Sequence, residues 1–280
     1  MTAELAGGGR RRVAVLMPVY NDQDGLARSL ESLRGDQGTF DLVVVDDGSR
    51  PALVIPPDLP FDVELVRLGR NQGIVGALNA GLAHILAAGH YDYVARLDAG
   101  DRSLPGRMAA QMAFLDAHPE HAMVGCWTMH VDPAGRFLID FQPPAAHGQV
   151  IRFLRYRTAL VHTSIMLRRR ALEEIGFYRA PFAGAEDLEL YLRLARRYKL
   201  ANLERTYAVR EITPDSITSR RQRIVRCRLR VLAHHFDARS LHTYLGLASN
   251  LVFLLLPRAG VLRQRQLAGR VSRARAARRP

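Results

Sequence analysis

Acidic side chains follow three apolar segments of the sequence, at the points where these segments end. Asp22 lies just beyond residues 13–19, Asp46 and Asp47 follow residues 42–45, and Asp98 and Asp101 follow residues 93–97. Carboxylates that gather in one place repel one another unless a cation lies between them. One such acid alone is better explained as the cap of a following helix. Three in sequence order favour a site for a divalent cation and a phosphate-bearing ligand.

Such a site needs strands whose ends meet at one edge of a sheet. The apolar runs 13–19 and 42–45 are typical of strands buried on both faces. Residues 63–66 and 93–97 predict two more strands, and residues 26–33 and 73–88 have helical spacing. Alternation of strands and helices predicts an α/β fold with a parallel sheet, which binds ligands beyond the carboxyl ends of its strands.

The order of elements changes after residue 100. Helices are expected at 104–117, 185–198 and 217–236, strands at 122–131, 137–141 and 160–167, and an apolar stretch at 241–256. Residues 258–280 are rich in Arg and Ala and predict a solvated helix or a tail. We expect two parts, an α/β domain over 1–215 and a helical basic extension over 216–280.

The net charge is concentrated at one end of the chain. The 280 residues carry +13, with 48 % apolar and 24 % charged residues, which excludes wholesale disorder. Fifteen arginines against one acid give residues 220–280 a charge of +14, which leaves −1 for residues 1–219. The charge therefore bears on where the protein works, and no nucleic-acid-binding motif accompanies it.

The two cysteines and the N-terminus bear on the compartment. Cys126 and Cys227 have no metal-ligand spacing, which fits a reducing compartment. The apolar run 13–19 follows three arginines but is short and contains Pro18, so it predicts a first strand and not a signal peptide.

Six ordered segments carry a resemblance to a known family. They are VAVLMPVYN at 13–21, LVVVDDGS at 42–49, RNQGIVGALNAGL at 70–82, VARLDAGD at 94–101, HTSIMLRRRALEEIGFYR at 162–179 and AEDLELYLRL at 185–194. In order and spacing the chain resembles a family 2 glycosyltransferase of the GT-A fold, of the non-processive bacterial type. The resemblance covers roughly residues 12–200 and implies a Rossmann-like, mostly parallel sheet flanked by helices.

The resemblance implies a nucleotide-sugar donor at the first half of the sheet. Tyr20 would lie against the nucleobase, Asp47 would bond its edge, and Asp46 would serve the base or the ribose. The other donor-side residues that it implies are Pro18, Asn21, Asn71, Gly73, Asn79 and Asp98.

Asp98 and Asp101 correspond to the family's metal-binding acidic motif, which implies Mn²⁺ or Mg²⁺ as a cofactor. The family usually has acids one residue apart, often with a third directly after, whereas the middle position here is Gly100. Either Asp98 or Asp101, or both, would hold the metal.

Glu186 and Asp187 match the acidic pair that begins a helix in the family. Asp187 would be the general base that removes the acceptor hydroxyl proton, in a displacement that inverts the anomeric carbon. Glu186 would be its neighbour on the acceptor side. Acids in a first helical turn also interact favourably with the helix dipole, which is the alternative explanation of this pair.

Three further residues are acceptor-side candidates. His162 falls where the family places a polar residue, Arg193 lies on the helix of Asp187, and Trp127 could stack on a sugar. The alternative is a structural role for His162 and Arg193 and a core position for Trp127. A Gln-x-x-Arg-Trp motif, which marks processive synthases, is absent after residue 187.

The sequence therefore predicts an inverting, metal-dependent glycosyltransferase that moves a sugar, with UDP as the first candidate nucleotide, to a lipid-linked or polysaccharide glycan precursor. Alternatives are a sugar nucleotidyltransferase, although its glycine-rich N-terminal signature is missing, and a non-catalytic nucleotide-sugar-binding module at a membrane surface. We expect a cytoplasmic protein. Residues 220–280 either dock it on the anionic inner face of the cell membrane or form a core helix pair with a solvated tail.

Overall fold

The computed structural model describes residues 12–212 and 221–255. Their strands are β1 Val13–Val19, β2 Asp41–Asp46, β3 Val63–Arg67, β4 Tyr93–Arg96, β5 Arg102–Ser103, β6 His121–Val131, β7 Phe137–Phe141, β8 Met166–Arg168 and β9 Lys199–Glu211. The α-helices are α1 Gln23–Ser32, α2 Gly73–Ala88, α3 Arg107–Ala117, α4 His147–Leu154, α5 Arg169–Ile175, α6 Glu186–Leu194, α8 Arg221–His234 and α9 Leu241–Leu255. Short 3₁₀ helices are η1 Leu33–Asp36, η2 His162–Ser164 and η3 Ala180–Phe182.

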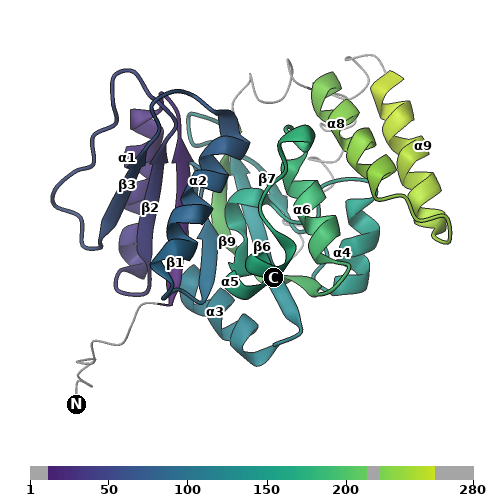
Figure 1. The fold of residues 1–280 in the computed structure, drawn as a ribbon, viewed down its shortest axis with the longest axis horizontal. Coiled ribbons are helices and arrows are strands. Elements are labelled where there is room, and N and C mark those ends of the chain that lie inside the picture. The colour runs from purple at the N-terminus through teal and green to yellow at the C-terminus, as the bar shows by residue number, and fades with distance from the viewer. Residues whose placement is uncertain (1–11, 213–220, 256–280) are drawn as a thin grey trace.

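The described strands form one nine-stranded sheet in the order β3-β2-β1-β4-β8-β6-β9-β5, with β7 paired to β6 (Figure 1). Strands β3, β2, β1 and β4 are parallel, and β6 pairs in parallel with β9. The short strand β8 runs antiparallel between β4 and β6. The parallel half therefore brings the carboxyl ends of β1, β2 and β4 to one edge, as the strand pattern predicts.

The two faces of the sheet are covered by different helices. Along β1, Ala14 and Leu16 pack in one cluster with α2, α4 and α6, whereas Val13, Val15 and Met17 pack in a second cluster with α1 and α3. This alternation follows from the two-residue period of a strand. A run that is apolar at every position is therefore what a strand between two helical layers requires.

One expected strand, at residues 160–167, is wrong. The chain instead turns at η2 and resumes as β8 at Met166. The Ser164 backbone N–H and hydroxyl both donate to the Val161 carbonyl at 2.9 Å, which closes the turn. A short buried apolar run does not distinguish a turn from a strand. The turn has a functional consequence, because it presents His162 and Thr163 beside the end of β4.

Helices α8 and α9 run antiparallel against the helical layer that contains α4 and α6 (Figure 1). Val231 and Leu232 of α8 are buried in the same cluster as the core of α6. Within the described part of the chain no helix is long and apolar enough to cross a bilayer. The expected boundary at residue 215 and the expected helix or tail at 258–280 lie outside the described residues.

Candidate active site

The end of β1 is tied to the loop that follows β2. The Asn21 backbone N–H donates to the Ser49 hydroxyl at 2.9 Å, and the Asn21 side-chain oxygen accepts from the Arg50 N–H at 2.8 Å. Asn21 itself has a left-handed backbone, with φ of 51°. Pro18 lies inside β1, whereas Tyr20 emerges from this junction with 49 % of its surface exposed. An aromatic ring is thus presented to solvent at the strand end.

Asp46 and Asp47 are buried and fix the backbone around them. Asp46 accepts from the Ser49 N–H at 2.8 Å, and Asp47 accepts from the N–H groups of Gln72 and Gly73 at 2.7 and 2.9 Å. Asp47 therefore caps the beginning of α2. A carboxylate has about four acceptor positions, so these bonds leave room for a ligand donor.

Gly48 allows the loop after β2 to pass against the next loop. Its φ is +75°, and a Cβ at this position would lie 2.6 Å from the Arg70 carbonyl carbon. Only glycine meets both requirements without strain. Gly48 therefore fixes the position of residues 70–73 beside the ends of β1 and β2.

The two asparagines that the sequence predicts at the donor site, Asn71 and Asn79, have different surroundings. The Asn71 side chain is exposed and accepts from the Gly73 N–H at 2.9 Å, at the start of α2. The Asn79 amide instead bonds both backbone groups of Tyr178, donating to its carbonyl at 2.9 Å and accepting from its N–H at 3.1 Å. Asn79 thus holds the loop before η3 in place.

Asp98 lies at the carboxyl end of β4 beside a buried cation. The Arg96 guanidinium, only 1 % exposed, donates to the Asp98 carboxylate and to the Leu16 carbonyl. Burial raises the pKa of Asp98, but the nearby positive charges, Arg96 first among them, outweigh burial and lower it. The Asp98 side chain remains 38 % exposed. It is therefore an ionised carboxylate that a ligand can reach.

Asp101 lies behind Asp98 and is almost fully buried. Its carboxylate accepts from the Glu211 N–H at 2.9 Å, which joins the end of β9 to the motif. Burial and the charge of Asp98 raise the pKa of Asp101 to about 7. A cation between the two groups would relieve this repulsion.

Asp98 and Asp101 differ in how each could contribute to a site for a divalent cation. Asp98 is ionised and accessible, so it can serve as an oxygen ligand beside the phosphates of a substrate. Asp101 already accepts from the Glu211 N–H and bonds Thr163, so it supports the motif from within. A separate group of possible ligands among the described residues, His118, Glu120 and His121, lies at the turn from α3 to β6.

Glu186 and Asp187 begin α6. The Glu186 carboxylate accepts from the Gly184 N–H, and the Asp187 carboxylate accepts from the Leu188 N–H at 2.7 Å. Burial, the charge of Asp187 and, less strongly, that of Asp98 raise the pKa of Glu186. The carboxylates at the start of α6 therefore interact electrostatically with Asp98, which follows β4.

His162 lies between these two sets of acids. Its Nε2 is 2.7 Å from the Tyr178 hydroxyl oxygen. Burial and the charge of Arg96 lower the pKa of His162 to about 4, against the opposing charges of Asp98 and Asp187. The imidazole is therefore neutral at pH 7 and can exchange a hydrogen bond with Tyr178.

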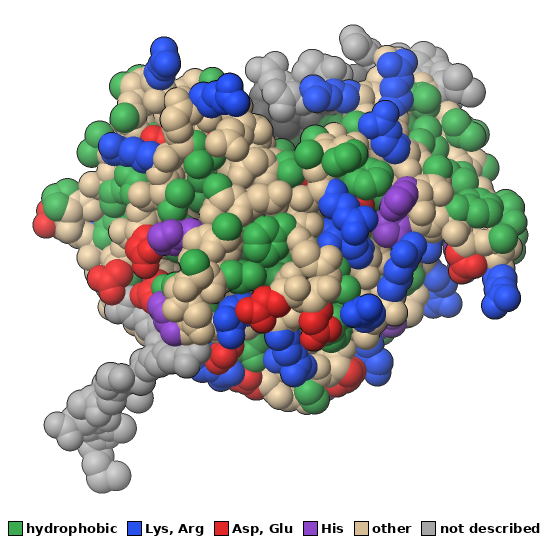
Figure 2. Space-filling view, viewed as in Figure 1, with side chains coloured by type: hydrophobic (Ala, Val, Ile, Leu, Met, Phe, Trp, Pro, Cys, Tyr) green, Lys and Arg blue, Asp and Glu red, His purple; other side chains and the backbone are tan. Residues whose placement is uncertain are grey.

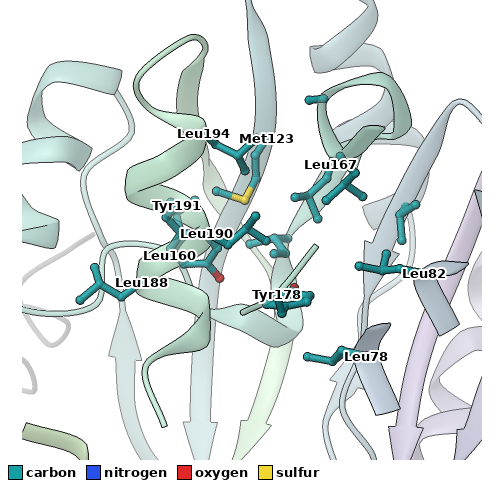
Figure 3. Close-up of a cluster of buried hydrophobic side chains, with 14 of the residues drawn as sticks. Leu78, Leu82, Met123, Leu160, Leu167, Tyr178, Leu188, Leu190, Tyr191 and Leu194 are labelled. Carbon is teal, nitrogen blue, oxygen red and sulfur yellow. The ribbon is translucent and has the colours of Figure 1, made fainter. Parts of the chain in front are cut away.

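Sequence reasoning missed three residues at this site. Tyr178 and Tyr191 lie in the buried cluster between α2 and α6 (Figure 3), and the pKa of each is raised first by burial and then by the charge of Asp187, among others. Arg228 of α8 also interacts electrostatically with Asp187. Tyr178 belongs to the segment 162–179 that carries the resemblance, whereas no local pattern marks Tyr191 or Arg228.

The other two acceptor-side candidates have structural partners. The Trp127 indole N–H donates to the Pro143 carbonyl at 3.1 Å. The Arg193 guanidinium is buried and donates to the carbonyls of Ile175, Gly176 and Phe177. Arg193 therefore holds the loop that leads to Tyr178, and its contact with an acceptor stays a prediction.

The match to a family decides the class of protein. The model of glycosyl transferase family 2 matches residues 14–176. The chain belongs to this family. The glycosyltransferase is 30 % identical over 206 residues to an uncharacterized glycosyltransferase of Haemophilus influenzae, covering 69 % of this chain and 73 % of the relative. It is 27 % identical to the amylovoran biosynthesis glycosyltransferase AmsE of Erwinia amylovora, covering 74 % of this chain and 79 % of the relative.

Solved structures agree on the fold of the glycosyltransferase. Residues 1–349 of Staphylococcus aureus TarS, in complex with UDP, match with a TM-score of 0.58 at 18 % identity, covering 86 % of this chain and 70 % of that one. The mannosyltransferase PcManGT of Pyrobaculum calidifontis, in complex with GDP-Man and Mn²⁺, matches with a TM-score of 0.61 at 20 % identity, covering 98 % and 77 %. The expected GT-A fold is confirmed.

Proposed function

We propose that this glycosyltransferase transfers a sugar from a nucleoside-diphosphate sugar to a hydroxyl group with inversion, and that Asp187 is the general base. The observation that supports this most is electrostatic. Asp98, at the end of β4, and Asp187, at the start of α6, both act on the pKa of His162. A base for the acceptor hydroxyl and an acid that can hold a cation for the diphosphate are what a single displacement needs.

In this mechanism Asp187 takes the hydroxyl proton as the acceptor oxygen bonds to the anomeric carbon. The bond from that carbon to the diphosphate breaks, and the diphosphate leaves with the electron pair. Glu186 flanks the base, and the neutral His162, bonded to Tyr178, borders the reacting groups. Asp98, backed by Asp101, would hold Mn²⁺ or Mg²⁺, which supplies positive charge for the departing diphosphate when bound.

UDP sugars and GDP-mannose are the donors to test first, because the similar structures contain UDP and GDP-Man. The Erwinia relative is named for amylovoran biosynthesis, which supports a polysaccharide or lipid-linked glycan as the acceptor. We further propose that the enzyme acts at the inner face of the cell membrane, because residues 220–280 carry all of its excess positive charge.

Metal removal tests the role of Asp98. We expect Mn²⁺ to strengthen binding of UDP or GDP roughly tenfold or more, because a cation held by Asp98 would supply positive charge for the diphosphate. EDTA should abolish this gain. Isothermal titration with each nucleotide, with and without Mn²⁺, measures the effect. In Asp98→Asn the gain should vanish, whereas Asp140→Asn, at an exposed acid of β7, should keep it; equal gains in both variants would exclude Asp98 as the ligand.

The exposed ring of Tyr20 gives a second test. Stacking of a base on an aromatic side chain contributes ~1–3 kcal/mol, so Tyr20→Ala should weaken nucleotide binding roughly tenfold. Tyr244→Ala is a matched control, because Tyr244 on α9 is 48 % exposed against 49 % for Tyr20. Unchanged affinity of Tyr20→Ala in the same titration would remove Tyr20 from the donor site.

A further inference from the structure

Helix α9 is oriented with two polar side chains inward and five large apolar side chains outward. Thr243 and Asn250 are buried against the rest of the protein. The apolar face of α9 consists of side chains between 47 % and 68 % exposed, namely Leu241, Tyr244, Leu245, Leu251 and Val252. An ordinary surface helix has the opposite arrangement.

The contacts of the inward side fix this orientation. The Asn250 amide donates to the Arg155 carbonyl at 3.3 Å, and its oxygen accepts from Arg228 Nε at 3.4 Å. Gly246 lies so close to Arg155 that a Cβ there would be 2.6 Å from the Arg155 carbonyl oxygen. Rotation of α9 to bury its leucines would break these bonds and drive larger side chains into the Arg155 backbone. The apolar face is therefore held outward.

The apolar face continues onto the turn between the two helices. Phe236 is 44 % exposed, and its ring packs edge-on against Tyr244 with the two ring centroids 5.2 Å apart. Figure 2 shows hydrophobic side chains gathered along the edge of the molecule formed by α9. Large apolar side chains that gather in this way on a solvent-exposed surface are typical of an interaction site.

The charge around this face indicates its partner. In the described residues 221–255 there is one acid, Asp237, whereas exposed arginines are found at Arg223, Arg226, Arg230 and Arg239. The sequence that follows α9 contains eight arginines and no acid over 256–280. Apolar side chains beside an excess of arginine complement the interface of a membrane that contains anionic lipid. A protein partner would not require such a uniform positive charge.

We propose that the apolar face of α9 inserts into the boundary between headgroups and acyl chains of an anionic membrane, with the neighbouring arginines on the lipid phosphates. Helix α9 then lies along the membrane surface without crossing it. The proposal rests on the proposed location of the enzyme at the membrane, and it does not depend on the chemistry of transfer. Helix α8 would link the surface to the site, because its Arg228 donates to Asn250 of α9 and also interacts electrostatically with Asp187.

Vesicle sedimentation with the full-length protein tests the proposal. The probes are vesicles of phosphatidylcholine alone and of phosphatidylcholine mixed with phosphatidylglycerol. The wild type should bind the mixed vesicles, and binding should weaken as salt is added. The variant Leu245→Gln/Leu251→Gln/Val252→Gln should lose roughly tenfold or more of this affinity, because it removes apolar surface that enters the lipid. The matched control is Val54→Gln/Leu138→Gln, two exposed apolar side chains elsewhere, which should bind as the wild type does.

Three results would overturn the proposal. They are wild-type protein that binds neither kind of vesicle, a triple variant that binds as tightly as the wild type, and a wild-type dimer in sedimentation velocity that the triple variant abolishes without any vesicle binding. The third result would assign the face to a second copy of the chain. Nucleotide titration of the same samples separates this test from the proposed reaction. Intact nucleotide binding with no vesicle binding overturns the docking surface alone.

Discussion

Replacement of Asp187 by Asn is expected to lower turnover by about 10²–10⁴-fold, the usual contribution of a general base. The amide has nearly the same shape but cannot take the acceptor proton. Nucleotide affinity should stay within about twofold, because a base that acts only on the acceptor contributes to the transition state and not to donor binding. Steady-state kinetics and nucleotide titration of the same protein sample measure the two effects.

Glu204→Gln is the control for this substitution, because it removes an exposed acid from β9. It should leave turnover and affinity unchanged. Thermal unfolding of both variants checks that α6 remains folded. An Asp187→Asn protein that keeps its turnover would remove Asp187 from the reaction. Equal losses of turnover and nucleotide affinity would instead place Asp187 on the donor.

Glu189→Gln is expected to cause the largest loss of stability. Glu189 is fully buried two residues after the proposed base, and it accepts from the Arg193 guanidinium at 2.9 Å. Arg179 and His235 lie 3.4 and 3.6 Å from the same carboxylate. Removal of the negative charge from a buried ion pair costs about 3–5 kcal/mol, because the remaining cation is left without a counter-charge.

The same group gives the unfolding free energy a defined pH dependence. Burial raises the pKa of Glu189, but its bonds to His235 and Arg193 and the charge of Arg179 outweigh burial and lower the pKa to about 2. Because the folded pKa lies below the unfolded value near 4.5, this stabilisation is complete above pH 4.5. It is lost as the pH falls from about 4.5 towards 2.

Chemical denaturation at pH 7 and at a series of acidic values measures both effects. Glu173→Gln is the matched control, because Glu173 pairs with Arg169 at 3.0 Å on the surface with 43 % of its side chain exposed. Such a pair contributes about 0–1 kcal/mol. Similar losses in the two variants would mean that the ion group around Glu189 does not hold α6 in place.

The parallel half of the fold could be predicted from the sequence because its strands are buried on both faces. The runs 13–19 and 73–88 match β1 and α2 at both ends. The prediction of a strand at 160–167 was wrong because the hydrogen bonds that close η2 cannot be recognised in the apolar pattern. The orientation of α9 could not be predicted from the sequence either. It depends on contacts with Arg155 and Arg228, both of which are distant from α9 in the chain.

The positions of Asp98 and Asp187 relative to regular elements were predictable from local motifs. Asp98 follows β4 and Asp187 lies in the first turn of α6, while the roles of both stay predictions. The burial of Asp101 and the engagement of Asn79 with Tyr178 arise from long-range packing instead. Arg228 comes from the basic extension, and its electrostatic interaction with Asp187 is long-range in the sequence.

The central proposal, sugar transfer with inversion, is tested most directly by the anomeric configuration of the product. Time-resolved proton NMR of the enzyme with UDP sugars or GDP-mannose, Mn²⁺ and a glycan acceptor follows the donor and the product together. We expect the nucleoside diphosphate to accumulate while the sugar first appears with the anomeric configuration opposite to that of the donor. A first product that retains the donor configuration would contradict the single displacement at Asp187, and so would the absence of transfer from every donor.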